Sequence, residues 1–335
     1  MGAVDATVNL TLQLLPTNFL LPGLFISACI VSLCMGTSVG TIVALMPIAA
    51  SLADKTDMSL PLMSAAIVGG AFFGDNLSFI SDTTIVATQS QGCKANDKFK
   101  YNFFLVLPAA IIVFIIYLIM GQASQEVVAD TVLWWKIIPY ATVLITAALG
   151  MNVMLVLLIG NILTGIVGIA DGSYGFMEWT SSMTSGIMGM SELIIVTLLA
   201  GGMLALIRYN GGIDYLIRVL TLHIRGKRGA KLTIALLVIL ADLCTANNTI
   251  ALVTVGPMAR EIADKYGIDK RLSASLLDTF SCFAQGMIPY GAQLLMAAGL
   301  AAITPFEIMA YLYYPMALGA VALMGIFFNY PRKYS

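Results

Sequence analysis

Stretches of mostly apolar residues, each about as long as a membrane-spanning helix, recur along the chain, for example at 101–120 and 188–207. In lipid the backbone must satisfy its own hydrogen bonds, so spanning segments of this kind have to be α-helices. Charged residues make up 10% of the 335 residues, whereas a soluble domain typically carries about 25%. The sequence therefore predicts an all-α polytopic membrane protein whose surroundings are a lipid bilayer, with no nucleic-acid partner.

One membrane-length segment is interrupted by a polar run, Gly74-Asp75-Asn76-Leu77-Ser78-Phe79-Ile80-Ser81-Asp82-Thr83-Thr84. Carboxylates are costly at bilayer depth, and glycine with several hydroxyls suits an unwound backbone that faces a cavity rather than lipid. We therefore predict a broken transmembrane helix over residues 60–93, an element at which secondary transporters bind ions and substrates. The alternative is a polar kink that only joins helices, but the run is more polar than packing requires.

Another interruption divides residues 20–51 at Gly36-Thr37-Ser38-Val39-Gly40-Thr41. Each apolar arm has only about 10–15 residues, whereas a crossing helix needs about 20. We predict a re-entrant helical hairpin with its polar tip at mid-membrane, and a single kinked span is the alternative. Further spans are predicted at residues 101–120, 134–149, 153–170, 188–207 and 306–328, with a loop or surface helix at 171–186.

The last third of the chain repeats this pattern at an offset of 210 residues. Residues 232–263 form a second hairpin interrupted near Asn247, residues 272–301 form a second broken helix, and Ala53-Asp54-Lys55 recurs as Ala263-Asp264-Lys265. Two structural repeats are therefore predicted. The expected divisions are a first repeat core at 1–100, scaffold helices at 101–210, a second repeat core at 211–303, and a C-terminal span and tail at 304–335.

Positive charge indicates the orientation of these repeats. If each hairpin enters and leaves on one side, every Lys and Arg except Lys55 and Lys136 falls on the same face. Such a face is cytoplasmic, which predicts a cytoplasmic C-terminus and inverted repeats. About three spans precede the second repeat and none precedes the first, so we expect the chain to lack an N-terminal scaffold block, through truncation or a late start assignment.

Met35-Gly36-Thr37-Ser38-Val39-Gly40-Thr41, followed by the polar run at 74–84, resembles the NhaC-type sodium/proton antiporters of the ion transporter superfamily. The likeness extends over nearly the whole chain. It implies an inner-membrane carrier that exchanges sodium for protons, although some relatives exchange sodium and organic anions such as malate and lactate. It also implies an elevator-type fold, in which two hairpins and two broken helices move against a scaffold. The chain departs from the family at Asn76 and Phe79, where histidine and proline are common, so we assign no histidine a proton role.

Sodium prefers hard oxygen ligands, and the hairpin tips and broken helices are expected to bring such groups to the midplane. Asp75 and Asp82 would bind the transported sodium ion and carry the proton, and the sequence does not divide these roles between them. The predicted ion-binding residues are Thr37, Ser38, Asp75, Asn76, Ser78, Ser81, Asp82, Thr83, Asn247, Asn248, Thr249, Asp278 and Gln285. Asp278 is equally well interpreted as a structural carboxylate in an ion pair, and Asp242 is similar.

A buried carboxylate that holds either sodium or a proton, but is never left bare, would couple the two fluxes without ATP. One alternative is sodium- and proton-coupled exchange of a small organic acid held by hairpin amides. No arginine lies at a tip to bind such an anion. The other alternative is a passive ion channel, which paired hairpins disfavour.

The five cysteines form no ligand motif, so we expect them to have no metal or disulfide role. As a carrier, the protein is expected to have neither enzymatic activity nor a bound cofactor. The single histidine, His223, lies in a basic connector at 208–231 and is expected to be solvated. A homodimer is expected only by analogy with other elevator carriers.

Overall fold

The computed structural model describes residues 2–14, 16, 19–121, 133–149, 151–189 and 226–328, with scattered positions between 191 and 219. These residues are helical and contain no strand, which confirms the predicted all-α class. The helices are α1 (Ala3–Leu14), α2 (Leu20–Met35), α3 (Ser38–Thr56), α4 (Leu60–Leu77), α5 (Asp82–Gln91), α6 (Ala95–Met120), α7 (Trp134–Ala148), α8 (Val153–Ala170), α9 (Phe176–Gly189), α12 (Gly226–Thr245), α13 (Asn248–Tyr266), α14 (Lys270–Gly286), α15 (Ala292–Ala301), α16 (Pro305–Met309) and α17 (Tyr313–Phe328).

Three segments of the described chain are long and apolar enough to cross a membrane: Ser38–Thr56, Leu60–Gln91 and Ala95–Met120. The second of these joins α4 and α5 across their break. Shorter apolar helices occupy Leu20–Met35, Met154–Ala170, Ala292–Ala301 and Tyr313–Phe328. The prediction for His223 and many of the residues of the predicted span at 188–207 and of the basic connector lie outside the described residues.

Helix boundaries in the first and last thirds of the chain recur at the 210-residue offset. α3 spans Ser38–Thr56 and α13 spans Asn248–Tyr266, while α5 spans Asp82–Gln91 and α15 spans Ala292–Ala301. The residue before each second arm adopts the same extended backbone, with φ −149° at Thr37 and φ −150° at Asn247. Each of these side chains accepts a hydrogen bond from a backbone N–H three residues later, so each caps its helix in the same way.

The arms of the first hairpin are longer than the sequence suggested. α2 has 16 residues and α3 has 19, against the expected 10–15, because α3 continues past its apolar part to Thr56. Length alone therefore does not separate a hairpin arm from a crossing helix here. Packing is more informative, because α2 and α3 contact each other and both contact α4.

Glycines in α4 allow α2 to approach closely. A Cβ atom at Gly70 would lie 2.5 Å from the Phe25 carbonyl oxygen, and one at Gly74 would lie 2.2 Å from Ser32. At this contact the Ser32 hydroxyl donates to the Ala71 carbonyl oxygen over 2.6 Å. The first arm of the hairpin is thereby held directly against the half-helix that ends at the polar run.

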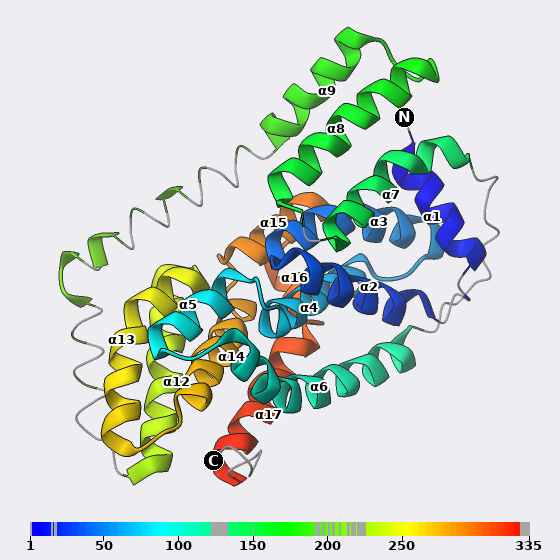
Figure 1. Cartoon of the computed structure of the whole chain (residues 1–335). Helices are drawn as coiled ribbons and strands as arrows, with labels where there is room; N and C mark the ends of the chain where they lie inside the picture. The colour runs from blue at the N-terminus through cyan, green and yellow to red at the C-terminus, as the bar shows by residue number, and fades with distance from the viewer. Residues whose placement is uncertain are drawn as a thin grey trace.

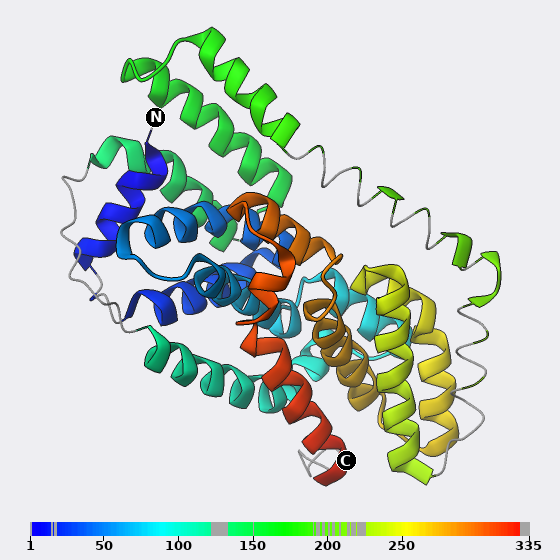
Figure 2. The ribbon, with the colours of Figure 1, turned by 180° about the vertical axis from the view of Figure 1, so that it is seen from behind.

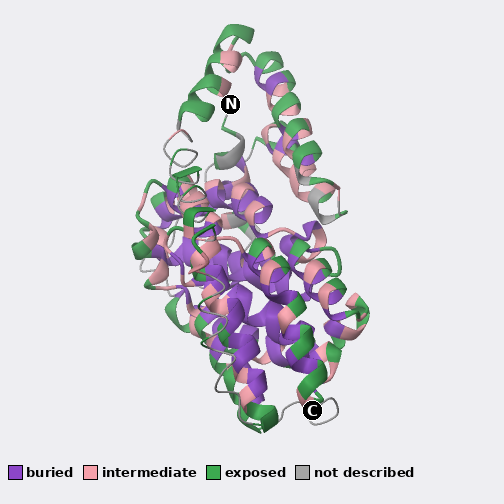
Figure 3. Ribbon diagram, turned by 90° about the vertical axis from the view of Figure 1, so that its left-hand side faces the viewer, coloured by how far each residue is buried: buried purple, intermediate pink, exposed green. Residues whose placement is uncertain are grey.

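The first and last thirds of the chain pack against each other through their short helices. α3 packs against α15, and α13 packs against α5, so each hairpin contacts the half-helix that follows the other break. Figures 1 and 2 show α12 and α13 side by side at one end of the molecule, with α8 and α9 projecting from the other. Buried residues concentrate in the body between these ends (Figure 3), whereas α8 and α9 are largely exposed.

Candidate functional site

A cavity of about 130 Å³ lies where the two hairpin tips meet the two helix breaks. Its lining comes from four separate parts of the chain: Gly36, Thr37, Ser38, Val39, Asp75, Asp82, Thr83, Asn247, Asn248, Thr249, Gln285, Ala292 and Gln293. Nine of these are residues predicted from the sequence to bind ions. The cavity thus gathers side chains from distant parts of the chain, as in the Gln293–Ser38 hydrogen bond between residues 255 positions apart.

Asp75 is the buried carboxylate of this cavity, with 4% of its surface exposed. Its polar neighbour is Ser38, whose hydroxyl and backbone N–H both face it. The charged groups that interact electrostatically with Asp75 are Asp278 and Asp82, and both are acidic. No basic side chain lines the cavity among the described residues, so the protein itself offers Asp75 no neutralising partner there.

A chain of amides holds the cavity wall together. The Gln285 side-chain NH2 donates to the Gln293 side-chain oxygen over 2.9 Å and to the Ala246 carbonyl oxygen over 3.0 Å. Gln293 in turn donates to the Ser38 hydroxyl over 3.0 Å. The Gln285 Oε1 atom is buried and has no hydrogen-bond partner, so this cavity-lining residue keeps an unused acceptor. Gln293 was not predicted, although the 210-residue offset from Thr83 would have indicated it.

Asp82 and Thr83 occupy different depths of the site. Thr83 is buried, whereas Asp82 lines the cavity but is exposed in the protein. Asp82 is also the first residue of α5, where a negative charge is favourable. The two predicted carboxylates therefore differ in their surroundings, with Asp75 enclosed and Asp82 at the cavity mouth.

Four helices begin at the cavity, because Ser38, Asp82, Asn248 and Ala292 are the first residues of α3, α5, α13 and α15. Unpaired N–H groups give a helix N-terminus a partial positive charge. The electrostatic environment of the cavity is thus a balance between the aspartates and these four helix ends. Such an arrangement suits a cation bound at Asp75 and also provides N–H groups for an anion.

Four predicted ligands lie outside the cavity lining: Asn76, Ser78, Ser81 and Asp278. The two serines stabilise the break itself. Ser81 accepts from the Thr84 N–H over 3.3 Å and donates to the Asp75 carbonyl oxygen over 2.9 Å, so it caps α5 and ties it to the end of α4. Ser78 accepts from the Ile80 N–H over 3.3 Å. Their hydroxyls are used in positioning the helix ends.

Asn76 and Asp278 belong to a buried polar network behind the break. Asp278 forms an ion pair with Lys98, with 2.8 Å between Nζ and Oδ2, which matches the paired structural role considered for it. Lys98 was expected on the cytoplasmic face with Lys94 and Lys100, and that side of the membrane stays a prediction, but its side chain is 1% exposed and therefore not solvated. Lys98 and Asn102 lie one turn apart on the buried side of α6, together with Tyr101 and Leu105. That i, i+4 polar pair on an apolar face was the signal available in the sequence.

Asp242, in α12, is fully buried and makes one weak interaction. The Ser281 hydroxyl donates to its Oδ2 atom over 3.4 Å, and its Oδ1 atom has no partner. No ion pair involves Asp242 within the described residues. The paired role considered for Asp242 from the sequence does not describe it, because no cation of the described part of the chain lies within ion-pair distance.

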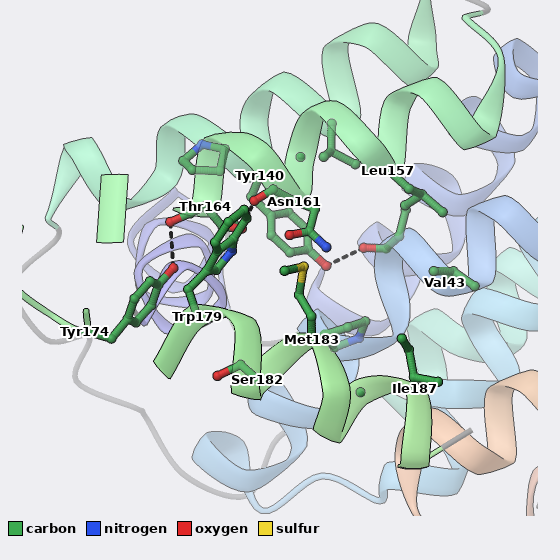
Figure 4. Close-up of a pocket in the computed structure, with 16 residues that line it drawn as sticks. Val43, Tyr140, Leu157, Asn161, Thr164, Tyr174, Trp179, Ser182, Met183 and Ile187 are labelled. Atoms are coloured by element: carbon green, nitrogen blue, oxygen red, sulfur yellow. Dashed lines mark hydrogen bonds between the residues drawn. The ribbon is translucent and has the colours of Figure 1, made fainter. Parts of the chain in front are cut away.

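A larger groove of about 770 Å³ lies between α3, α7, α8 and α9 (Figure 4). Figure 4 shows Leu157, Met183 and Ile187 along it, with Tyr140 bonded to the Ala44 carbonyl oxygen. No charged residue lines it in the described part of the chain, so it offers no carboxylate to neutralise a cation. Nor do the described residues include a cluster of three or more His, Cys, Asp or Glu that could hold a resident metal ion.

Comparison with known proteins gives a consistent result. Residues 1–122 and 126–330 match the family described as the Na+/H+ antiporter family. A malate-2H(+)/Na(+)-lactate antiporter of Bacillus subtilis (strain 168) is 23% identical over 368 residues, which cover 99% of this chain and 78% of that protein. The Na(+)/H(+) antiporter NhaC of Alkalihalophilus pseudofirmus is 25% identical over 331 residues, or 88% of this chain and 69% of that protein. A Na(+)/H(+) antiporter NhaC of Bacillus subtilis (strain 168) is 21% identical over 370 residues, or 99% of this chain and 80% of that protein.

Proposed function

The chain belongs to the Na+/H+ antiporter family, as its polar motifs predicted, and we propose that it exchanges sodium ions for protons by alternating access at the cavity between the hairpin tips. The observation that carries this proposal is the position of Asp75. It is a buried carboxylate in a cavity lined by hydroxyls and amides, with no basic side chain lining that cavity in the described chain.

Competition for Asp75 explains the coupling. An ionised carboxylate is costly to bury unless a cation or proton neutralises it. The surrounding hydroxyl and amide oxygens are ligands of the kind that a hard cation accepts. Ser38, Gln285 and the tips contribute such groups, and the free Gln285 Oε1 atom is among them. If the part of the protein that contains the cavity moves only when Asp75 holds sodium or a proton, sodium is exchanged for protons.

Alternating access follows from inverted repeats, which we propose for the first and last thirds of the chain. The recurrence of helix boundaries at one offset supports two copies of one unit. Each hairpin packs against the short helix that follows the opposite break, α3 against α15 and α13 against α5, which supports a single transport unit. The elevator movement implied by the family resemblance would carry this unit across the membrane.

We place the start of α6 and the connector between α13 and α14 on the cytoplasmic side. Residues of both segments line a common surface pocket, which includes Lys94, Lys270 and Arg271 beside three aspartates. Lysine and arginine, and hardly aspartate, set membrane orientation, so these basic residues support a cytoplasmic assignment. The inner membrane and the cytoplasmic C-terminus remain part of the same proposal.

The test is transport in reconstituted vesicles under opposed sodium and proton gradients. We expect Asp75→Asn to reduce sodium-driven proton counterflow to background, because the isosteric amide can neither ionise nor bind a proton. Asp54→Asn is the matched control, since Asp54 is exposed at the end of α3, and its exchange rate should stay within about twofold of wild type. Full exchange by a correctly inserted Asp75→Asn protein would refute the proposal.

Sodium- and proton-coupled exchange of a small organic acid is the second candidate. It is favoured by the four helix N-termini at the cavity and by the malate-2H(+)/Na(+)-lactate antiporter among the relatives. The same vesicles discriminate the candidates. An organic-acid exchanger stays inactive until malate or lactate is added, a sodium/proton exchanger saturates without it, and a channel shows conductance alone.

A further inference from the structure

The Lys98 side chain ends in a cage of oxygen atoms. Its ammonium lies 2.8 Å from Asp278 Oδ2 and 3.2 Å from the Asn76 carbonyl oxygen, and it also donates to the Thr84 hydroxyl. These three acceptors are a carboxylate, a carbonyl and a hydroxyl, one for each N–H of the ammonium. The cage connects α6 with α4, α5 and α14, so Lys98 bonds to both sides of the first helix break.

The cage is held in place by groups other than Lys98. The Asn102 side-chain NH2 lies 3.0 Å from Asp278 Oδ2 and 3.0 Å from the Asn76 carbonyl oxygen. The Asn76 side-chain NH2 donates to the same Asp278 oxygen over 3.2 Å, and Tyr314 donates to Asn76 Oδ1 over 3.0 Å. Ser275 donates to Asn102 in turn. The oxygens are therefore positioned by a second layer of hydrogen bonds.

One oxygen of the cage carboxylate is unused. Asp278 is 0% exposed, and its Oδ1 atom is buried without a hydrogen-bond partner. The oxygens around the ammonium are thus one carboxylate oxygen, one carbonyl and one hydroxyl, and the same carboxylate keeps a second oxygen that no hydrogen bond uses. A small monovalent cation takes oxygen ligands of this kind, by the same logic that governs hard cations in general.

The cage adjoins the proposed transport cavity. Asn76 follows Asp75 directly, and Thr84 lies two residues after Asp82, so the same break supports both sites. An ammonium and a sodium ion carry the same charge, and each would neutralise Asp278.

We propose that the cage is a second cation site whose occupant is the Lys98 ammonium, a cation attached to the protein that stands where a free sodium ion would otherwise bind. The inference rests on the proposed sodium chemistry of this fold, but its test measures stability and requires no transport. It implies that Lys98 contributes one fixed positive charge to the moving unit, and that removal of the amine opens a site for sodium.

The experiment compares thermal unfolding of detergent-solubilised full-length protein in sodium chloride and in choline chloride at equal ionic strength. All variants carry Asp75→Asn, which silences the transport cavity. Adding Lys98→Met should lower the melting temperature in choline, because Asp278 loses its partner. Sodium should then restore it by about 3 °C or more once its concentration is ten times the Kd, in a saturable manner.

The triple variant Asp75→Asn, Lys98→Met, Asp278→Asn is the matched control. Its cage is uncharged, so sodium and choline should give the same melting temperature. The proposal is overturned if Lys98→Met adds no sodium response to the Asp75→Asn background. It is also overturned if the Lys98→Met protein cannot be purified in sodium when the triple variant can, because sodium then fails to replace the amine. A sodium response that persists in Asp75→Asn alone would count against the proposed transport cavity and not against the cage.

Discussion

Two buried aspartates in the last third of the chain, Asp242 and Asp278, occupy opposite environments. Asp278 is paired with Lys98 and accepts hydrogen bonds from Asn76 and Asn102. Asp242 accepts one 3.4 Å bond from Ser281 and has no ion-pair partner in the described chain. A buried carboxylate with a cation is stabilised as an ion, whereas one without a cation favours its neutral form over an uncompensated charge. The same residue type therefore contributes to stability in two different ways.

Substitution by asparagine separates these two environments. Asp278→Asn leaves the Lys98 ammonium buried without a counter-charge, which costs about 3–5 kcal/mol. Asp242→Asn removes no ion pair and should cost about 1 kcal/mol, the typical effect of one substitution. Thermal unfolding in detergent should give a much lower melting temperature for Asp278→Asn than for Asp242→Asn. Equal losses would mean that the Lys98–Asp278 pair contributes little.

For single residues, the sequence predicted which polar residues lie at bilayer depth better than it predicted the side chains with which those residues interact. Asp75, Ser38 and Gln285 were predicted to lie near one another, because each belongs to a polar interruption of an apolar segment. Lys98 was missed, since a lysine four positions after Lys94 at the start of a helix has the pattern of a solvated charge. Its burial depends on Asp278, 180 positions later, and no local pattern contains that contact.

The two hairpin tips have the same backbone shape but different residues. Gly36 and Ala246 both adopt left-handed conformations, with φ 67° and φ 47°. Glycine tolerates this region, whereas a Cβ atom costs about 1–2 kcal/mol there. At Gly36 a Cβ atom would in addition lie 2.6 Å from Ile80 Cγ1 and 3.0 Å from the Ile80 carbonyl carbon. The first tip thus packs against the helix break through a glycine, and the second accepts strain at an alanine.

Reciprocal substitutions at the tips should have opposite signs. Gly36→Ala should destabilise the protein by about 2 kcal/mol or more, from backbone strain and the contact with Ile80. Ala246→Gly relieves strain and should stabilise the protein by up to about 1 kcal/mol. The check is the melting temperature of each variant against wild type. A Gly36→Ala protein as stable as wild type would contradict the close approach of the tip to the break.

Element positions were largely accessible from the sequence, and element lengths were not. Glycine and clustered hydroxyls indicated both interruptions, so α2 ends at Met35, directly before Gly36, and α4 ends at Leu77, within the second polar run. The ends of α3 and α13 were placed too early, because polar residues such as Asp54 and Lys55 can continue a helix beyond the apolar region. Hydropathy indicates only the part of a helix that lies in lipid, whereas the backbone hydrogen bonds of the helix can continue beyond the lipid.

The orientation of the whole molecule depends on whether the two repeats are inverted. Asp54 and Asp264 lie at equivalent positions, 210 residues apart, near the ends of α3 and α13, and both are exposed. In a parallel arrangement they would face the same side of the membrane. In an inverted arrangement Asp54 faces outward and Asp264 inward. Asp264 lines the same surface pocket as Lys94 and Arg271, in agreement with a cytoplasmic position.

Thiol labelling in intact cells decides between these arrangements. In a background where the five native cysteines are replaced, Asp54→Cys should react with a membrane-impermeant thiol reagent added outside. Asp264→Cys should react only after the cells are permeabilised, because its helix end faces the cytoplasm. The two substitutions are matched in residue type, helix position and exposure, so a difference in labelling reports the side of the membrane. Labelling of both from the outside, or of neither, would require parallel repeats, and the cavity would then lack the symmetry-related entrances that alternating access needs.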